Sequence, residues 1–241
     1  MKMRQSNKIH KHKIALILFM LLSISGYAQD SAVELLKSVE SKHKNLEAFH
    51  TQVVYSMFNN NSDTASESYT GYILKKEGVI YIKLLGAEVL QFPEVHILVD
   101  NDSKILTCSK SVNSNEQDTP LDVSKFLKLY TIASETTIKN TLILNMNLNK
   151  AAIHIPYKKI SLFINKNTLE IEKQVLYFSG EFDSTNIKQT PEKTSRLEVV
   201  FKGIAIEPPP KLERYVTITS DKKITPSTVF AGYKIIDQTH L

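Results

Sequence analysis

The strongest constraint on this chain is a series of strand-like segments that follow one another too closely for parallel pairing. From Phe49 to Met57 every second residue shares one face, which is the period of an extended strand. Similar runs follow at residues 69–75, 79–85, 95–100 and 104–109. A parallel crossover needs a dozen or more residues, whereas antiparallel neighbours need only a tight turn. The sequence therefore predicts an antiparallel sheet.

Two amphipathic helices are expected beside this sheet. Residues 31–47 carry apolar side chains at helical spacing, and residues 121–133 follow a proline at the position typical of a helix start. Further strand-like runs lie at residues 141–147, 159–165, 169–178, 196–202, 215–219 and 233–236. With no internal repeat and no long flexible linker, this order predicts a single α+β domain.

The first 28 residues have the features of a secretory signal peptide. Basic residues without any acid precede an unbroken apolar run from Ile14 to Leu22, and Gly26 and Ala28 place small residues before a cut at Gln29. Crossing a bilayer takes about 20 apolar residues, so the run is too short for a membrane span. We expect cleavage before Gln29 and a periplasmic protein, with an uncleaved anchor as the alternative.

Removing this leader changes the charge of the chain. The full sequence has 30 basic and 25 acidic residues, and the leader holds five of the basic ones. The near-neutral remainder gives no electrostatic reason to expect nucleic acid as a partner. With membrane complexes we expect peripheral contact at most. The single cysteine, Cys108, excludes an intrachain disulfide and lies too far from the cut to accept a lipid there.

Signatures of catalysis and of cofactor or metal binding are missing from the sequence. The glycines after the leader stand singly, so they form no phosphate-binding or dinucleotide-binding loop. The histidines are scattered, without the spacing of a metal site. Residues 100–102 begin like a calcium loop but lack its later glycine and glutamate. We expect no enzyme activity, no cofactor and no metal.

Several segments, in this order, carry a resemblance to a known family. They are Leu46-Glu-Ala-Phe49-His-Thr-Gln52, Val95-His-Ile-Leu-Val-Asp100, Lys159-Ile-Ser-Leu-Phe-Ile-Asn165, Leu169-Glu-Ile-Glu-Lys173 and Leu197-Glu-Val-Val-Phe201. Over residues 31 to 206 the chain resembles the periplasmic outer-membrane lipoprotein carrier family, the LolA-like proteins. The resemblance implies a strongly bent antiparallel sheet, an unclosed half-barrel covered by a few helices, with the acyl chains of a lipoprotein in the cavity between them.

The chain also departs from the family pattern. The family has an arginine early in the sheet that helps to hold its helical lid closed, and the matching region here reads Lys75-Lys76, without the planar guanidinium. The chain has no tryptophan, and it continues past Lys202 through a triple proline at 208–210. We expect a LolA-like domain over residues 29–206 and a C-terminal extension over 207–241 whose two short strands pack on the same domain.

The candidate ligand-binding site is a hydrophobic cavity between the helices and the apolar face of the sheet. Its expected residues are Val53, Tyr55, Met57, Ile80, Ile82, Leu84, Ile97, Val99, Phe126, Tyr130, Leu162, Ile164, Ile171 and Val175. Such a cavity would sequester lipoprotein acyl chains or other lipids without covalent chemistry, at about 0.8 kcal/mol per buried CH₂. Two alternatives stay open. The same side chains form an ordinary packed core, or the protein is a non-enzymatic envelope scaffold whose cavity is filled and whose edge docks a protein partner.

Overall fold

The computed structural model describes residues 31–60, 62–111, 123–149, 155–179, 194–219 and 223–239. The expected leader and its cleavage site before Gln29 lie outside these ranges. Most of the described strands join one sheet, in the order β14-β6-β5-β4-β3-β2-β1-β11-β10-β9-β8-β7. Within the described ranges, no helix has both the length and the apolar character needed to span a membrane.

The strands of this large sheet are mostly six to ten residues long. They are β1 (Phe49–Phe58), β2 (Glu67–Lys76), β3 (Val79–Leu84), β4 (Ala87–Gln91), β5 (Val95–Asp100), β6 (Ile105–Lys110), β7 (Tyr130–Ile138), β8 (Thr141–Leu148), β9 (Tyr157–Asn165), β10 (Glu170–Phe178), β11 (Arg196–Gly203) and β14 (Lys234–Gln238). A separate pair, β12 (Val216–Ile218) and β13 (Ile224–Pro226), forms a small second sheet.

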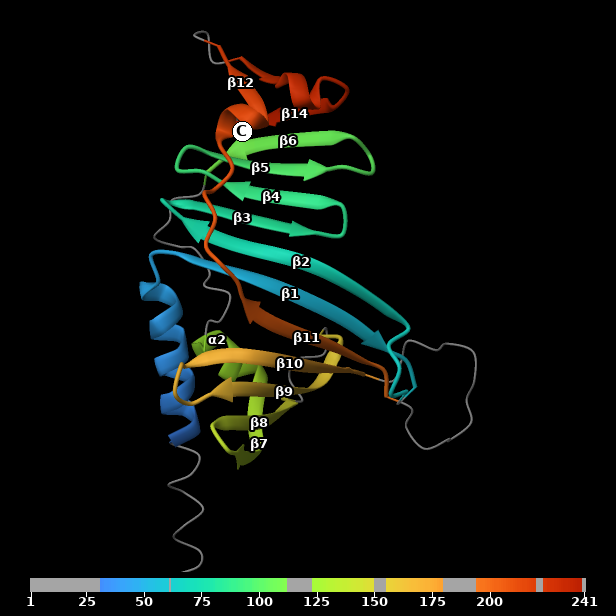
Figure 1. Cartoon of the computed structure of the whole chain (residues 1–241). Coiled ribbons are helices and arrows are strands. Elements are labelled where there is room, and N and C mark those ends of the chain that lie inside the picture. The colour runs from blue at the N-terminus through green and yellow to red at the C-terminus, as the bar shows by residue number, and fades with distance from the viewer. Residues whose placement is uncertain are drawn as a thin grey trace, which may run out of the picture.

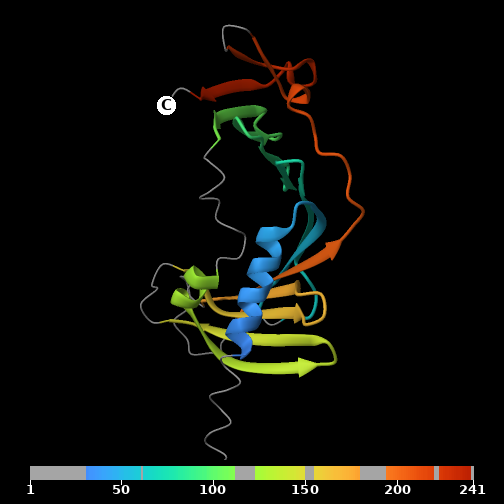
Figure 2. The same cartoon turned by 90° about the vertical axis from the view of Figure 1, so that its left-hand side faces the viewer.

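The large sheet is antiparallel at every step except the last, where β14 runs parallel to β6. It bends strongly without closing, and the helices lie on its concave side (Figures 1 and 2). We call this side the inner face and the opposite side the outer face. The predicted fold class, an α+β protein with an unclosed half-barrel, is confirmed.

The N-terminal helix, residues 31–45, covers only the part of the inner face formed by β8 to β10. Ala32, Leu36 and Val39 are its buried side chains, spaced three and four residues apart on one helical face. At the other end of the helix, the Lys42 ammonium bonds the Glu170 carboxylate at 2.8 Å. This partly exposed ion pair ties the helix to the β9–β10 turn, with a contribution to stability of only about 0.2–1 kcal/mol.

The second helix is shorter than the expected 121–133. Helix α2 covers Val123–Leu129, and the chain continues directly into β7 at Tyr130. Strand β7 is rich in threonine and isoleucine, which favour extended backbone because they branch at Cβ. The apolar spacing up to Tyr130 therefore spans a helix and the first residue of an edge strand.

Strand β4 was missing from the expected elements. It follows β3 through a two-residue turn in which Leu85 and Gly86 both have positive φ, 49° and 76°. Two consecutive positive φ angles are what a tight hairpin with the right twist requires. Glycine adopts this conformation readily but leucine rarely does, so the residue types did not indicate the turn.

The hydrophobic core is divided between the two faces of the sheet. We call the first part the inner cluster; its buried members are Ala32, Leu36, Val39, Val123, Tyr130, Leu142, Leu144, Met146, Ile160, Leu162 and Ile164. The second part, the outer cluster, comprises Val79, Leu90, Phe92, Val95, Ile97, Val99, Leu106, Cys108, Tyr215, Val216, Ile224 and Phe230. The inner cluster joins the helices to β7–β9, whereas the outer cluster joins β3–β6 to the C-terminal residues.

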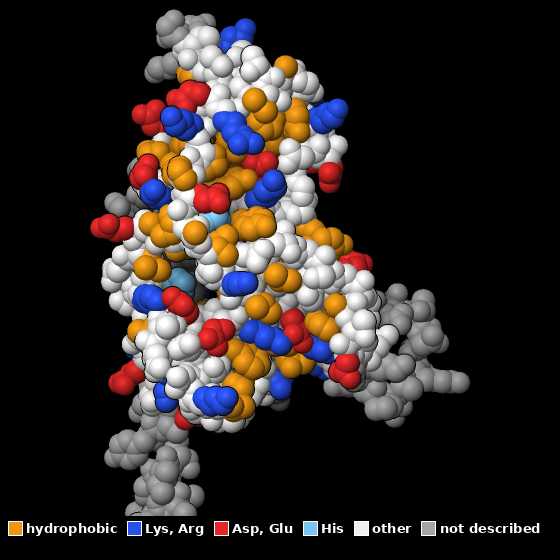
Figure 3. All heavy atoms as spheres, in the orientation of Figure 1, with side chains coloured by type: hydrophobic (Ala, Val, Ile, Leu, Met, Phe, Trp, Pro, Cys, Tyr) orange, Lys and Arg blue, Asp and Glu red, His pale blue; other side chains and the backbone are white. Residues whose placement is uncertain are grey.

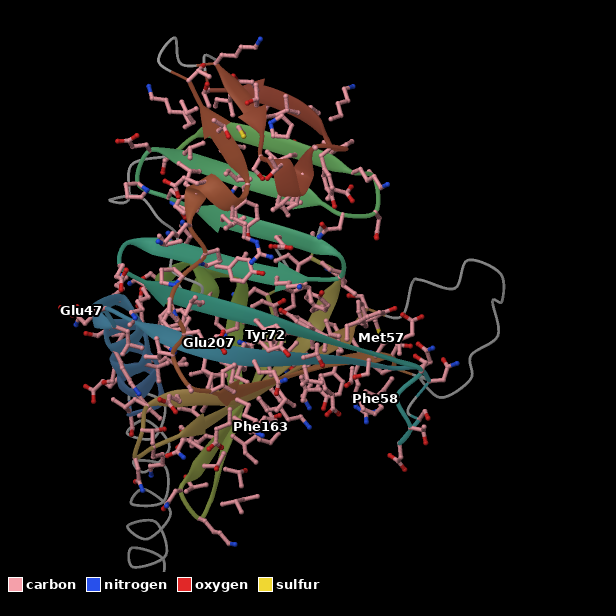
Figure 4. The ribbon with its side chains drawn as sticks, turned by 45° about the horizontal axis from the view of Figure 1, so that its top comes forward. Glu47, Met57, Phe58, Tyr72, Phe163 and Glu207 are labelled. Carbon is pink, nitrogen blue, oxygen red and sulfur yellow. The ribbon has the colours of Figure 1, made fainter. Side chains whose placement is uncertain are left out.

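The C-terminal residues reach the outer face through a linker that crosses the sheet. Figure 4 shows Glu207 on this linker, and Glu47 where the N-terminal helix leads into β1. Two 3₁₀ turns, η3 (Leu212–Arg214) and η4 (Thr228–Phe230), frame the buried Tyr215. The extension ends as β14 beside β6. In Figure 3 hydrophobic side chains and charges of both signs are interspersed over the outer face.

Candidate functional site

The candidate site is the part of the inner face formed by β1 to β6 and β14. Residues directly opposite each other on neighbouring strands point to the same face. The register aligns one such row across the sheet, which we call the apolar row: the aliphatic Ile73, Ile82, Val89, Leu98 and Ile236, with Thr107 as its one polar member. This row continues toward the inner cluster through Thr51, the partner of Ile73 on β1, so it lies on the inner face.

The apolar row is accessible to solvent. Leu98 is 40% exposed, and the other members are half-buried. None of them belongs to either hydrophobic cluster of the described residues. Among the described residues, the inner face is therefore packed under the helices but not over β2 to β6, whereas the C-terminal extension covers the outer face of β3 to β6.

The structure divides the fourteen expected site residues between the two faces of the sheet. Five lie on the open part of the inner face and are half-buried: Tyr55, Met57, Ile80, Ile82 and Leu84. Five belong to the inner cluster or pack against it: Phe126, Tyr130, Leu162, Ile164 and Ile171. Val53 is buried on the inner face between these groups, 1% exposed.

The remaining expected site residues, Ile97, Val99 and Val175, lie on the outer face. Ile97 pairs with Leu90 and Cys108, whereas its neighbour Leu98 belongs to the apolar row. Val175 pairs with Ser161, one residue out of step with the inner-facing Leu162. This corrects the expectation that the sheet residues of this set share one face, because a shift of one residue along a strand reverses the face to which a side chain points.

Sequence reasoning missed Ile73, Val89, Leu98 and Ile236 as site residues. A signal was present, since these residues stand in consecutive apolar runs rather than in strict alternation: Tyr72-Ile73-Leu74, Val89-Leu90, Ile97-Leu98-Val99 and Ile235-Ile236. A strand with apolar residues at both odd and even positions presents apolar side chains on both faces, which is typical of a strand covered on both sides. One face is accounted for by the extension, and the other face is the candidate site.

Gly71 lets one side chain of the site lie flat on the sheet. A Cβ added to this buried glycine would approach the Lys83 carbonyl oxygen to 2.7 Å and the Leu84 Cδ1 to 3.1 Å. Leu84 therefore lies over the strand β2 backbone, where any larger residue at position 71 would displace it. This close approach extends the apolar surface of the site toward Val53, the partner of Gly71 on β1.

The end of the site nearest the N-terminal helix carries histidine. His43 lies edge-on to Phe49, with ring centroids 6.5 Å apart, and burial followed by the Lys42 charge lowers the pKa of His43. On β5, the His96 Nδ1 lies 3.4 Å from the Ser109 hydroxyl, and burial lowers the pKa of His96 as well. Both shifts favour uncharged imidazoles near the apolar surface.

The described residues of this face show no metal-binding cluster and no reactive thiol. Among the described residues, no three His, Cys, Asp or Glu side chains come together in a way that could hold a metal ion. Cys108 is fully buried in the outer cluster, and burial raises the pKa of its thiol to about 12, which suppresses the reactive thiolate. The open inner face offers mainly a curved apolar surface.

The solved structures that resemble this chain do so at low sequence identity and low TM-score. No family model and no curated protein matches it. An uncharacterised conserved protein from Thermus thermophilus is 14% identical, with a TM-score of 0.44, covering 86% of this chain and 99% of its own. A LolA superfamily protein from Nitrosomonas europaea is 12% identical, with a TM-score of 0.32 and coverages of 73% and 94%.

An outer-membrane lipoprotein-sorting domain from Vibrio parahaemolyticus is also 12% identical, with a TM-score of 0.28, covering 71% of this chain and 91% of its own. LolA superfamily proteins and lipoprotein-sorting domains are thus among the folds similar to this chain. At these identities and TM-scores the likenesses are too distant to assign a function to its residues.

Proposed function

We propose that this chain is a periplasmic carrier or binding protein that sequesters lipoprotein acyl chains or other lipids on the open inner face of its half-barrel. The observation that carries the proposal is the apolar row, whose side chains belong to neither hydrophobic cluster and remain partly exposed. Binding would be non-covalent, with the gain coming from the transfer of aliphatic groups out of water, about 0.8 kcal/mol per CH₂.

The two-sided character of β3 to β6 supports this proposal. The outer face of these strands is buried by the C-terminal extension through Tyr215 and Phe230. Strands with apolar residues on both faces are usually covered on both, and adjoining apolar side chains that stay partly exposed are a candidate site for a ligand or a partner. The half-barrel curves around the uncovered face (Figure 2), which favours an occupant of small cross-section such as an acyl chain.

The sequence supports the proposed location and ligand class. The expected leader directs the chain beyond the inner membrane, and the resemblance to the LolA-like family over residues 31 to 206 implies lipoprotein acyl chains as cargo. Lipid that arrives by diffusion through an aqueous compartment needs a carrier that covers its chains, because each exposed CH₂ opposes transfer.

The first test is native mass spectrometry of the protein purified from its own periplasm. Co-purifying lipid supports the proposal. Protein that emerges without lipid, and that takes up no 11-(dansylamino)undecanoic acid when this fluorescent fatty acid is added, contradicts it.

A matched pair of variants locates the binding face. Ile82→Glu places a carboxylate in the apolar row, and Ile143→Glu places one at a half-buried position on the outer face of β8. We expect Ile82→Glu to abolish uptake of the fluorescent fatty acid and Ile143→Glu to retain it, with thermal unfolding recorded for both. Equal uptake by the two variants would rule out the inner face as the site.

An interaction protein is the second candidate, favoured by the outer edge of β7. This nine-residue strand pairs only with β8 among the described strands, and its residues 133–138 are all exposed. An uncovered edge of this length accepts an added strand from a protein partner. A lipid-free protein that instead co-purifies with an envelope protein, and loses it when Thr136 is changed to proline, would favour this candidate.

A further inference from the structure

A row of polar side chains lies beside the apolar row on the open inner face. The register places Lys75 opposite Ile80, Ile80 opposite Gln91, Gln91 opposite His96, His96 opposite Ser109, and Ser109 opposite Gln238. We call the polar members of this set, Lys75, Gln91, His96, Ser109 and Gln238, the polar row. Each stands two residues along its strand from a member of the apolar row, a separation of about 7 Å.

The two rows together give the face an amphipathic pattern. From β2 to β6 the apolar row spans four inter-strand steps, about 19 Å at the usual spacing. The polar row runs alongside it over the same strands, at the end of the sheet where the N-terminal helix leads into β1 (Figure 4). A purely apolar cargo would gain nothing from this row, whereas an amphiphile would bring a polar head to it.

The polar row is rich in hydrogen-bond donors and contains no carboxylate. Lys75 supplies an ammonium, and Gln91 and Gln238 supply amides. The contact between the Ser109 hydroxyl and the His96 Nδ1 leaves the Nε2 atom of that ring for a ligand. Four of the five side chains are half-buried, Gln238 being the exposed one, so bonds to them are less weakened by water than bonds on an open surface.

We propose that the polar row binds the head of the amphiphile and that this head carries an oxyanion, a carboxylate or a phosphate. This inference rests on the proposed lipid-binding function. The charge of Lys75 and the donors beside it match an oxyanion, and a cationic head would meet no acceptor of opposite charge in the row. The neighbouring Lys76 faces the other side of β2 and pairs with Glu77 at 3.4 Å, so it takes no part.

The test compares ligands that share one chain and differ in the head. Hexadecyl phosphate, palmitate, hexadecanol and hexadecylamine compete with 11-(dansylamino)undecanoic acid for the full-length exported protein, and inorganic phosphate competes without a chain. We expect the two anionic lipids to bind at least about tenfold more tightly than hexadecanol, since a hydrogen bond to a charged group has that effect on an equilibrium. Inorganic phosphate alone should displace nothing.

A matched pair of lysine variants assigns the effect to the polar row. Lys75→Met should remove most of the preference for hexadecyl phosphate over hexadecanol and leave hexadecanol binding within about twofold. Lys76→Met, one residue along the same strand on the outer face, should retain the preference. Gln91→Leu should reduce it in the same sense as Lys75→Met, with a smaller effect because an amide is neutral.

The outcomes separate this inference from the proposed function. Tight hexadecanol binding without any preference for the anionic heads overturns the role of the polar row and leaves lipid binding intact. Equal effects of Lys75→Met and Lys76→Met also overturn it, because a general charge effect would then explain the preference. Failure of every lipid to compete overturns both proposals, and displacement by inorganic phosphate alone shows an ion site without a chain site.

Discussion

The Tyr215→Phe substitution tests how the C-terminal extension is held on the outer face. Tyr215 is 1% exposed, and its hydroxyl donates to the Glu88 carboxylate at 2.9 Å. The Tyr81 hydroxyl donates to the same oxygen at 3.1 Å. The Tyr215 ring stacks on Phe230, with centroids 5.3 Å apart. Phenylalanine retains this ring contact and removes only the hydrogen bond.

The expected loss follows from the charge of the acceptor. A hydrogen bond to a charged group contributes about 1.5–3 kcal/mol to the free energy of unfolding. Tyr81 remains to bond Glu88, so the variant does not leave the carboxylate entirely without a donor. For a chain of this size each kcal/mol shifts the melting temperature by about 2–4 °C, so we expect a decrease of about 3–12 °C.

Thermal unfolding followed by circular dichroism measures this loss, and Tyr233→Phe is its control. The Tyr233 hydroxyl donates to Asn101 Oδ1 at 2.9 Å, within the same extension but to a neutral acceptor, for which about 0.5–1.5 kcal/mol is expected. A decrease for Tyr215→Phe no larger than that for Tyr233→Phe would refute the reasoning that Glu88 anchors the extension as a charged group.

The same bond gives stability a dependence on alkaline pH. Burial, and then the charge of Glu88, raise the pKa of Tyr215 above its ordinary value near 10. The unfolded chain therefore releases this proton at lower pH than the folded one, so the contribution is complete below pH 10 and decreases above it. We therefore expect the free energy of unfolding of the Tyr215→Phe variant to decrease less steeply with pH above 10 than that of the unmodified protein.

Three further predictions concern the packing of the sheet. Gly71→Ala should lower the free energy of unfolding by about 1–3 kcal/mol, because the added Cβ has no room. Gly203→Ala should not lower it, because a Cβ added there has no neighbouring heavy atom within 4 Å. Denaturant unfolding compares the two variants. Cys108, whose thiol pKa is raised to about 12, should react with a disulfide reagent at pH 8 only after denaturation, and rapid reaction of the folded protein would contradict its burial. Leu144→Ala should lower the free energy of unfolding by about 2–5 kcal/mol. Ile138→Ala, at a 56% exposed position, should change it by less than about 0.5 kcal/mol. Similar losses for the two variants would contradict the burial of Leu144 in the inner cluster.

Much of the fold was predictable because its signals are local. The period-two pattern of β1 and the short turns after it predict antiparallel strands from neighbouring residues alone. The missed elements depend on tertiary context instead. The β3–β4 turn places Leu85 at positive φ, which its residue type disfavours, and the apolar spacing through Tyr130 is compatible with helix until the chain pairs with β8.

The candidate site was predictable in composition but not in placement. Alternation along one strand shows which residues share a face, as it does for Tyr55 and Met57. It does not show which face of one strand matches which face of a distant strand. That choice depends on register, and it places Ile82 and Leu98 on the inner face but Ile97 on the outer face.

The sequence by itself determined the antiparallel class, the apolar character of the strands and the helical N-terminal segment, because each follows from spacing along the chain. Tertiary structure alone decided how the apolar surface is shared. The helices bury the inner face at β8 to β10, and the extension buries the outer face at β3 to β6. Among the described residues the rest of the inner face stays uncovered, because burial depends on long-range contacts that spacing along the chain does not reveal.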